Sequence, residues 1–379
     1  MKFPDFKHFI HPKVTARHTK SHWLPADRWF LLAILLLTVL GIVMVYNASV
    51  AIAIRDFSDR YYFVREQLRW LGIGLVALSL FAWVDYHIWY RFALPVLFIS
   101  ILLLLSVFIP GLGVRALGAH RWIHLGSIVL QPAEFTKLAL VLYLSAWFSR
   151  PEKRRLVPFL LLMGTVVGLV VIEPDLGTST IILLTGLVMY FLSGAPIVQF
   201  FLLIPMLASA LFGLAVLSPY RYRRLTTFLS PESDPLGASY QIRQVLLAFG
   251  SGGLFGVGLG KSRQKYEYLP EANTDSIFAI IAEEMGFIGA AVVIGIFVFL
   301  LWRGFRIARS APDPFGKFLA AGISSWIGIQ ILMNLSAMVA LVPLTGIPLP
   351  LVSYGGSSLV ITLCALGIVV NVSKQRLKS

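Results

Sequence analysis

Residues 29–50 read WFLLAILLLTVLGIVMVYNASV, a run that contains no charged side chain. A helix needs about 20 apolar residues to cross the hydrocarbon core of a bilayer, so this run predicts a membrane-spanning helix. Residues 1–28 are basic but polar, and the apolar run lacks a small-residue cleavage pattern. We therefore expect no removable signal peptide, and we expect this first span to stay in the membrane.

Apolar runs of similar length recur almost to the end of the sequence. The 379 residues are 58% hydrophobic and 13% charged, with a mean hydropathy of +0.81, which is too apolar for a soluble globular domain of this size. The sequence predicts an all-α integral membrane protein of about ten transmembrane helices, with one membrane domain over residues 29–372 between polar tails at 1–28 and 373–379. The runs lie near residues 29–50, 70–86, 91–109, 135–149, 157–172, 177–194, 198–217, 276–302, 317–341 and 350–372.

The distribution of lysine and arginine predicts the orientation. The segments that alternate onto one side hold 18 of these residues, whereas the short loops on the other side hold 6. Cytoplasmic loops carry the excess of positive charge, so we expect both termini in the cytoplasm. The formal charge of +14 does not indicate nucleic acid, because the basic residues lie in loops between spans and are not interleaved with stacking aromatic residues.

The longest polar loop, residues 218–275 between the seventh and eighth predicted helices, is basic although we expect it outside. Long loops can be translocated regardless of their charge, so one interpretation is a tolerated excess. The other is that the loop binds an anion. Its basic residues are Arg221, Arg223, Arg224, Arg243, Lys261, Arg263 and Lys265.

Asp275 is the last residue of this loop and comes directly before the apolar run that begins Ser276, Ile277, Phe278. An Asp in that place commonly caps a helix, and residue physics alone favours this interpretation. The helix dipole favours the charged carboxylate and opposes a general base poised near neutral pH, whereas burial in an apolar cavity acts in the opposite direction.

Two other pairs of charged residues lie at predicted helix ends. Glu134 and Lys137 share one face of the fourth predicted helix, where they either neutralise each other or face a wet cavity inside the bundle. Both interpretations stay open. Glu173 and Asp175 lie in an outer turn with Pro174, and we interpret them as solvated turn residues.

Cysteine and histidine offer little for metal binding. Cys364 is the only cysteine and lies in the last apolar run, which excludes a disulfide framework and a thiolate metal site. His120 and His124 have the spacing of zinc ligands on a helix, but their segment lacks a helical pattern and no third ligand is adjacent. We predict no metal site there.

Two segments predict irregular backbone at membrane depth. Residues 239–244 open a short amphipathic segment that ends in the glycine-rich stretch 250–260, which we expect to lie in the membrane interface or to dip into it. Pro343, Gly346, Pro348 and Pro350 lead into residues 353–358, Ser-Tyr-Gly-Gly-Ser-Ser. Lipid excludes such backbone unless protein or a water-filled cavity surrounds it, so we expect this segment to lie buried near the site.

Together these motifs resemble the SEDS family of shape, elongation, division and sporulation proteins, which includes FtsW and RodA. The likeness covers nearly the whole chain. Residues 268–272, Tyr-Leu-Pro-Glu-Ala, resemble the division branch, FtsW, more than the elongation branch, whose version usually reads Phe-Ile-Pro-Glu-Arg. The matching stretches are residues 44–49, 118–123, 131–137, 173–178, 240–260, 268–275 and 350–358.

The resemblance implies a peptidoglycan glycosyltransferase that polymerises lipid II on the outer face of the bacterial cytoplasmic membrane during septal cell-wall synthesis. It implies a class B penicillin-binding transpeptidase and other divisome membrane proteins as partners. By this resemblance Asp275 is the essential carboxylate, and we hypothesise that it removes the proton from the acceptor hydroxyl. The undecaprenyl pyrophosphate that leaves needs positive groups, or a divalent cation such as Mg²⁺ or Mn²⁺, to balance its charge. The predicted substrate-binding residues are Arg223, Arg243, Lys261, Lys265, Glu134, Lys137, Gln241, Glu271, Ser353 and Tyr354.

One position departs from the family pattern. Family members commonly carry His-Thr-Asp-Phe, whereas this chain carries Asn273, Thr274, Asp275 and Ser276, so any imidazole role is absent. Two rival functions remain. A lipid II flippase should offer charge to both sides of the membrane, and here the outer charge concentrates in one loop. A non-catalytic scaffold for a transpeptidase should tolerate Asp275→Asn.

Overall fold

The computed structural model describes residues 25–116, 119–125, 128–152, 155–216, 222, 226, 228, 238–266 and 268–375. It is mostly helical, with one small sheet. The helices are α2 (Arg28–Phe57), α3 (Tyr62–Trp83), α4 (His87–Ser106), α5 (Pro132–Phe148), α6 (Leu156–Ile172), α7 (Leu176–Leu192), α8 (Ile197–Val216), α10 (Ala238–Gly252), α11 (Ile277–Arg309), α12 (Pro314–Met338) and α13 (Gly356–Lys374). The strands are β1 (Gly113–Ala116), β2 (Ala119–Leu125) and β3 (Ile128–Leu130).

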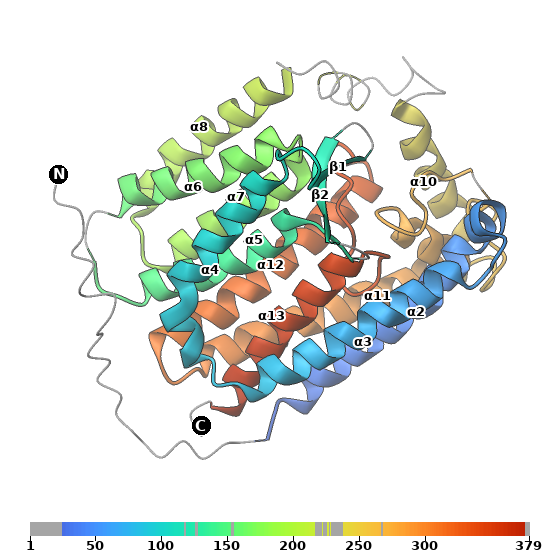
Figure 1. Cartoon of the computed structure of the whole chain (residues 1–379). Helices are drawn as coiled ribbons and strands as arrows, with labels where there is room; N and C mark the ends of the chain where they lie inside the picture. Colours follow the sequence, from blue (N-terminus) through green and yellow to red (C-terminus); the bar gives the residue numbers. More distant parts are fainter. Residues whose placement is uncertain are drawn as a thin grey trace.

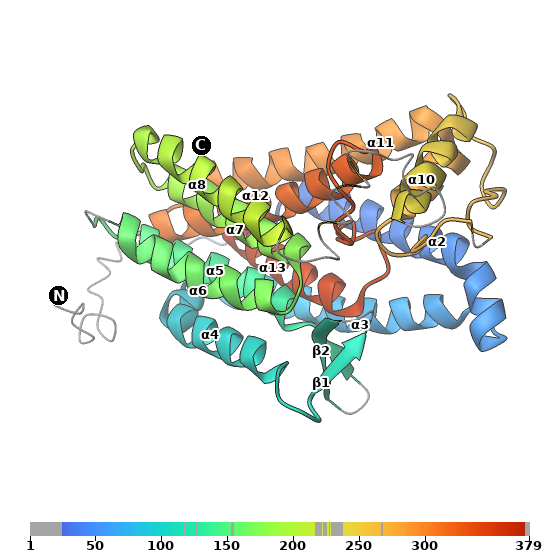
Figure 2. The same cartoon turned by 90° about the horizontal axis from the view of Figure 1, so that it is seen from above.

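The long helices form one bundle, with α2, α3, α11 and α13 on one side (Figure 1) and α5 to α8 on the other (Figure 2). At one end, the start of α2 meets the ends of α3 and α13. There the Asn371 side-chain amide donates to the Ala82 carbonyl at 2.9 Å, and the Asp27 N–H donates to Ser373 Oγ at 3.2 Å. The sheet and α10 lie at the opposite end (Figure 1). The candidate site is at that second end.

A helix stands at each of the ten predicted spans, with its ends displaced by at most eight residues. The run expected at 276–302, for example, forms Ile277–Arg309. Within the described residues, five helices are long and apolar enough to cross a membrane, namely α2, α4, α11, α12 and α13. Shorter apolar helices cover Leu156–Ile172, Leu176–Leu192 and Ile197–Leu207.

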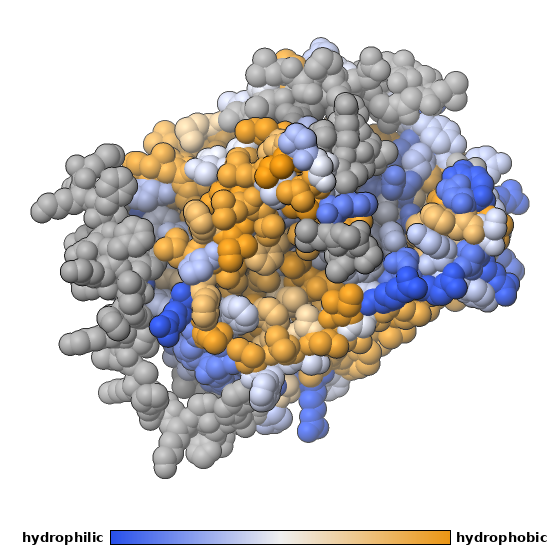
Figure 3. All heavy atoms as spheres, in the orientation of Figure 1, coloured by the Kyte–Doolittle hydropathy of each residue, from blue (hydrophilic) through white to orange (hydrophobic). Residues whose placement is uncertain are grey.

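Large apolar side chains cover the outside of the bundle. Trp83 and Phe201 are both 75% exposed and Phe255 is 80% exposed. Figure 3 shows hydrophobic residues across the middle of the molecule, with hydrophilic residues gathered towards the ends. An exposed apolar surface of this extent requires a lipid environment. The chain is therefore a multi-pass membrane protein.

The all-α prediction missed the small sheet, whose antiparallel strands follow the order β1-β2-β3. Its segments are too short and too polar to register as spans, but Val114, Trp122 and Val129 favour extended backbone. The Ser357 hydroxyl donates to the Val129 carbonyl at 3.0 Å, so the sheet is tied to the start of α13. The strand also separates the Cα atoms of residues 120 and 124 by about 13 Å, which is too far for two ligands of one zinc ion.

Glycine lets α3 and α13 approach closely. A Cβ atom on Gly367 would lie 2.6 Å from the carbonyl oxygen of Leu78, and one on Gly356 would strike the Trp70 ring. Small residues at such contacts are typical of helix packing in membranes. The contact holds the segment before α13 against α3, where the buried Gln67 side chain donates to the Ser353 carbonyl at 3.3 Å.

Candidate functional site

Helix α11 is kinked at Gly286, whose φ of 68° and ψ of −171° are essentially restricted to glycine. Main-chain carbonyls beside the kink are satisfied by the glycine-rich stretch that follows α10. The Val257 N–H donates to the Glu283 carbonyl at 3.0 Å, and the Gly258 N–H donates to the Glu284 carbonyl at 3.1 Å. The segment expected in the membrane interface is therefore α10 and a turn that packs against the unwound part of α11.

The carboxylates of Glu283 and Glu284 then fasten the loop that leads to Asp275. The Ser262 N–H donates to Glu284 Oε1 and the Arg263 N–H donates to Glu283 Oε1, both at 3.1 Å. Both carboxylates are buried. Sequence reasoning missed this role, because two adjacent glutamates inside an apolar run do not reveal which loop they contact.

Lys265 is part of the same buried cluster. Its Nζ lies 3.3 Å from Glu284 Oε1 and donates to Asn47 Oδ1 at 2.8 Å and to the Gly260 carbonyl at 2.6 Å. The side chains of Lys265 and Glu284 are 3% and 0% exposed. The structure does not support the prediction that Lys265 binds a pyrophosphate, because its ammonium group already has three partners inside the protein. It holds the loop instead.

The main chain around Asp275 is fixed from two directions. The Asn334 side-chain amide, from α12, donates to the Asp275 carbonyl at 2.8 Å. From the segment before α13, the Ser353 hydroxyl donates to the Thr274 carbonyl and the Tyr354 N–H donates to the Asn273 carbonyl at 2.9 Å. Asp275 is 6% exposed. The Asp275 carboxylate therefore lies on a backbone that is held by two other parts of the chain, α12 and the segment before α13.

The interpretation of Asp275 as a helix cap is wrong in detail. The N-cap of α11 is Ser276, one residue later, and its side chain makes no capping bond. Instead Ser276 Oγ accepts a hydrogen bond from Gln241 Nε2, on α10, at 3.0 Å. Gln241 therefore joins α10 to the start of α11 directly beside Asp275.

Helix α12 links the Glu134 and Lys137 pair to this site. Lys137 Nζ lies 2.7 Å from Glu134 Oε1 and donates to Gln330 Oε1 at 2.8 Å. Gln330 and Asn334 are one turn apart and therefore share a face of α12. The side chains of Glu134 and Lys137 are 4% and 2% exposed. The mutual ion pair is thus real, and a polar stripe runs from it to Asp275.

The amide groups of that stripe also organise the proline-rich segment. Gln330 donates to the Pro348 carbonyl at 3.0 Å and Asn334 donates to the Ile347 carbonyl at 2.8 Å. These two residues were not among the predicted site residues. Their signal in the sequence is a pair of amides at helical spacing inside an otherwise apolar run.

Glu173 and Asp175 are not solvated turn residues, and that interpretation is wrong. They are 0% and 7% exposed. Asp175 accepts hydrogen bonds from the Thr178 N–H and from Gln131 Nε2, both at 3.0 Å. The guanidinium of Arg121, on β2, donates to the carbonyls of Glu173 and Pro174. The turn is therefore buried beneath the sheet.

The stability of the protein should depend on pH through the carboxyl group of Glu173, which lies in the turn after α6. Burial, reinforced by the nearby Asp175 charge, raises the Glu173 pKa from 4.5 to about 8. Because the folded protein retains a proton that the unfolded chain releases, this group's stabilisation is present below pH 4.5 and is lost as the pH rises towards 8. Glu173→Gln should gain thermal stability relative to wild type as the pH rises from about 5 to about 8.

The matched control is Glu152→Gln, which alters an exposed glutamate. Its melting temperature should differ from that of wild type by the same amount at each pH. Parallel pH profiles for wild type and Glu173→Gln would contradict a protonated, buried Glu173.

The other predicted substrate-binding residues that the structure describes lie on α10, on the loop before Asp275 and in the segment before α13. Arg243, on α10, and Lys261 are exposed, as is Glu271, whose carboxylate accepts a hydrogen bond from Thr274 Oγ1 at 2.7 Å. The Tyr354 ring packs edge-on against Phe63 with centroids 5.2 Å apart. Arg223 lies outside the described residues, as do Arg221 and Arg224.

The arrangement suits proton transfer beside an anionic group. Asp275 can accept a proton, because a carboxylate is a competent general base when a substrate hydroxyl reaches it. Exposed basic residues on α10 and on the loop can bind phosphate oxygens. Across the described residues there is no group of three or more His, Cys, Asp and Glu side chains placed to hold a metal ion.

The sequence of this chain is similar to those of known proteins. The family model for the cell cycle proteins FtsW, RodA and SpoVE matches residues 27–378. Stage V sporulation protein E of Bacillus subtilis is 44% identical over 92% of this chain and 97% of its own length. A probable peptidoglycan glycosyltransferase FtsW of Trichlorobacter lovleyi is 43% identical over 92% of this chain and 93% of its own length.

Solved structures show the same fold. A chain of a peptidoglycan synthase complex, studied for the structural coordination of polymerization and crosslinking, superposes with a TM-score of 0.77 and 30% identity. The match covers 94% of this chain and 100% of that one. The rod shape determining protein RodA of Thermus thermophilus superposes with a TM-score of 0.70 and 31% identity over 94% of this chain and 99% of its own.

Proposed function

Because the chain belongs to the family of cell cycle proteins that includes FtsW, RodA and SpoVE, we propose that it is a peptidoglycan glycosyltransferase that polymerises lipid II. The relatives named FtsW and SpoVE are 43% and 44% identical to it, and the solved RodA is 31% identical. The likeness to relatives named FtsW supports the division branch and hence a role in septal cell-wall synthesis.

In the proposed reaction, an acceptor sugar hydroxyl attacks the anomeric carbon of the donor. A new glycosidic C–O bond forms, the bond from that carbon to the pyrophosphate breaks, and undecaprenyl pyrophosphate leaves with the electron pair. Asp275 takes the hydroxyl proton. The observation that carries this assignment is the fixed main chain of a buried Asp275, held by Asn334 from α12 and by the segment that contains Ser353.

Positive charge near the leaving group would stabilise the transition state. Arg243 is exposed on α10 and Lys261 is exposed on the loop that leads to Asp275, and both carry that role in the proposal together with Arg223. Gln241, Glu271 and Tyr354 would contact the sugars or the peptide. Glu134 and Lys137 would line the inner part of the substrate cavity, where Gln330 fixes the lysine.

The proposed topology has ten spans, both termini in the cytoplasm and Asp275 on the outer face. The positions of the ten helices support it, as does the excess of basic residues at the end of the bundle where α2 begins and α13 ends. This orientation gives the enzyme access to lipid II outside the cell, where glycan strands are assembled.

A polymerisation assay tests the function. The full chain is reconstituted in liposomes with fluorescent lipid II, with and without a class B penicillin-binding transpeptidase, and glycan length is read on a gel. We expect polymer that increases when the partner is present. Movement of lipid II between leaflets without any polymer under either condition would instead identify a flippase and overturn the proposal.

A further inference from the structure

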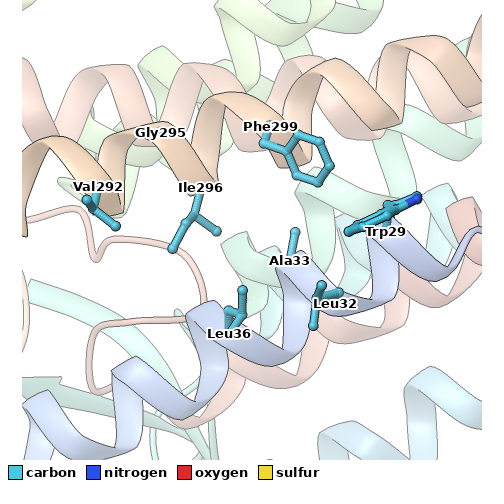
Figure 4. Close-up of a pocket in the computed structure, with 8 residues that line it drawn as sticks. All are labelled: Trp29, Leu32, Ala33, Leu36, Val292, Gly295, Ile296 and Phe299. Carbon is cyan, nitrogen blue, oxygen red and sulfur yellow. The ribbon is translucent and has the colours of Figure 1, made fainter.

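A groove separates α2 from α11 on the lipid-facing side of the bundle, far along both helices from Asp275. Figure 4 shows its two walls facing each other. The hollow measures about 250 Å³ and is lined only by apolar residues and glycine. The walls carry Trp29, Leu32 and Leu36 on α2 and Val292, Gly295 and Phe299 on α11.

The groove belongs to one leaflet. It begins in the first turn of α2 and ends ten residues before the end of α11, so it lies in the half of the bundle that the proposed topology assigns to the cytoplasmic side. From Val292 to Phe299 a helix rises about 10 Å, which fits within the roughly 15 Å of one leaflet's hydrocarbon. An acyl chain lying along the helices would therefore fill it, whereas a transmembrane segment would extend well beyond it.

Cationic and indole groups continue the groove towards the membrane surface. The Trp302 ring lies 5.9 Å from the Phe299 ring, and the guanidinium groups of Arg303 and Arg306 lie 5.6 Å and 5.5 Å from the centre of the Trp302 ring. Tryptophan at this depth is typical of the headgroup region. Together these residues form a basic headgroup cluster.

The charge of that cluster is only partly balanced inside the protein. Arg303 forms a largely buried ion pair with Asp27, the N-cap of α2. Arg306 is exposed, and in the described part of the chain no carboxylate forms an ion pair with it. A ligand that combines an acyl chain with a negative phosphate would complement both the groove and Arg306.

The geometry points to a binding site for an anionic glycerophospholipid of the cytoplasmic leaflet, with one acyl chain between α2 and α11 and the phosphate at Arg306. Gly295 leaves room for the acyl chain, since a Cβ atom on this residue would meet no other atom within 4 Å. The site is separate from the proposed lipid II site and would give the enzyme a preference for membranes that contain anionic lipid.

Native mass spectrometry of the full chain in detergent tests this site with phosphatidylglycerol and phosphatidylcholine of the same acyl chains as probes. Wild type should retain phosphatidylglycerol in preference to phosphatidylcholine. Arg306→Gln should lower that preference about fivefold, since one basic residue near a lipid phosphate contributes about 1 kcal/mol. Gly295→Leu, which fills the groove, should lower the retention of phosphatidylglycerol as well.

Matched controls are Arg91→Gln and Gly164→Leu. Arg91 is exposed on α4, and Gly164 is an exposed glycine of α6 where an added Cβ also meets nothing within 4 Å. Both controls should behave as wild type. Equal retention of the two lipids, or equal behaviour of Gly295→Leu and Gly164→Leu, would overturn the proposal. So would a Gly295→Leu variant that keeps its lipid but loses the transpeptidase, because the groove would then receive a protein helix.

Discussion

Asp275→Asn should abolish polymerisation of lipid II while leaving the protein folded and bound to its transpeptidase. A general base contributes about 10²- to 10⁴-fold to a rate, so we expect at least about a hundredfold loss of polymer formation. The fold should survive because Asn334 binds the main-chain carbonyl of residue 275, which the substitution leaves in place. The measurement is glycan synthesis by purified enzyme with its partner, alongside thermal stability and co-purification.

A matched control separates this effect from a general loss of outer-side charge. Asp56→Asn makes the same chemical change at an exposed aspartate that pairs with Arg55 at the end of α2. Its activity should equal that of wild type. If Asp275→Asn folds, binds the transpeptidase and still polymerises lipid II at the wild-type rate, Asp275 is not the base and the scaffold alternative gains support.

Lys137→Met should destabilise the protein strongly. Removal of the ammonium leaves Glu134 charged, buried and without its cation, and breaking such a pair typically costs about 3 to 5 kcal/mol. We expect a marked fall in melting temperature in detergent. Lys317→Met is the matched control, because Lys317 is exposed near the start of α12, and its melting temperature should change little.

The double variant Glu134→Gln, Lys137→Met distinguishes a structural role of this ion pair from a role in contacting the substrate. Replacement of both charges removes the uncompensated carboxylate, so most of the lost stability should return. Activity should stay low if the pair lines the substrate cavity. A double variant that regains both stability and polymerisation would show that the pair is purely structural, which contradicts its proposed role towards substrate.

The helical architecture could be predicted from the sequence because lipid imposes a simple length rule on apolar runs. The run from residue 29 and the run from residue 276 both gave helices at the expected places. The sheet at residues 113–130 escaped this rule, since it is short and forms by pairing between strands. Such pairing depends on partners that local pattern does not identify.

The sequence identified charged residues of the candidate site but not the residues that they contact. The basic charge drew attention to residues 218–275, yet it could not show that Lys265 pairs with Glu284, which lies beyond Asp275 on another element. Glu173 was predicted to be solvated because its place in a turn does not show that contacts with Arg121 bury it beneath the sheet. The contacts of Gln330 and Asn334 with the site become visible only when the structure places α12 against Asp275.

The most direct test of the proposed mechanism is the distance from the Asp275 carboxylate to the acceptor hydroxyl in a structure of this chain with its transpeptidase and two lipid II analogues bound. A general base should lie about 2.6 to 3.2 Å from that hydroxyl, or reach it through one water. We predict that distance, with the donor pyrophosphate on the side of Arg243 and Lys261. An acceptor hydroxyl bound out of reach of Asp275, against another base, would contradict the mechanism.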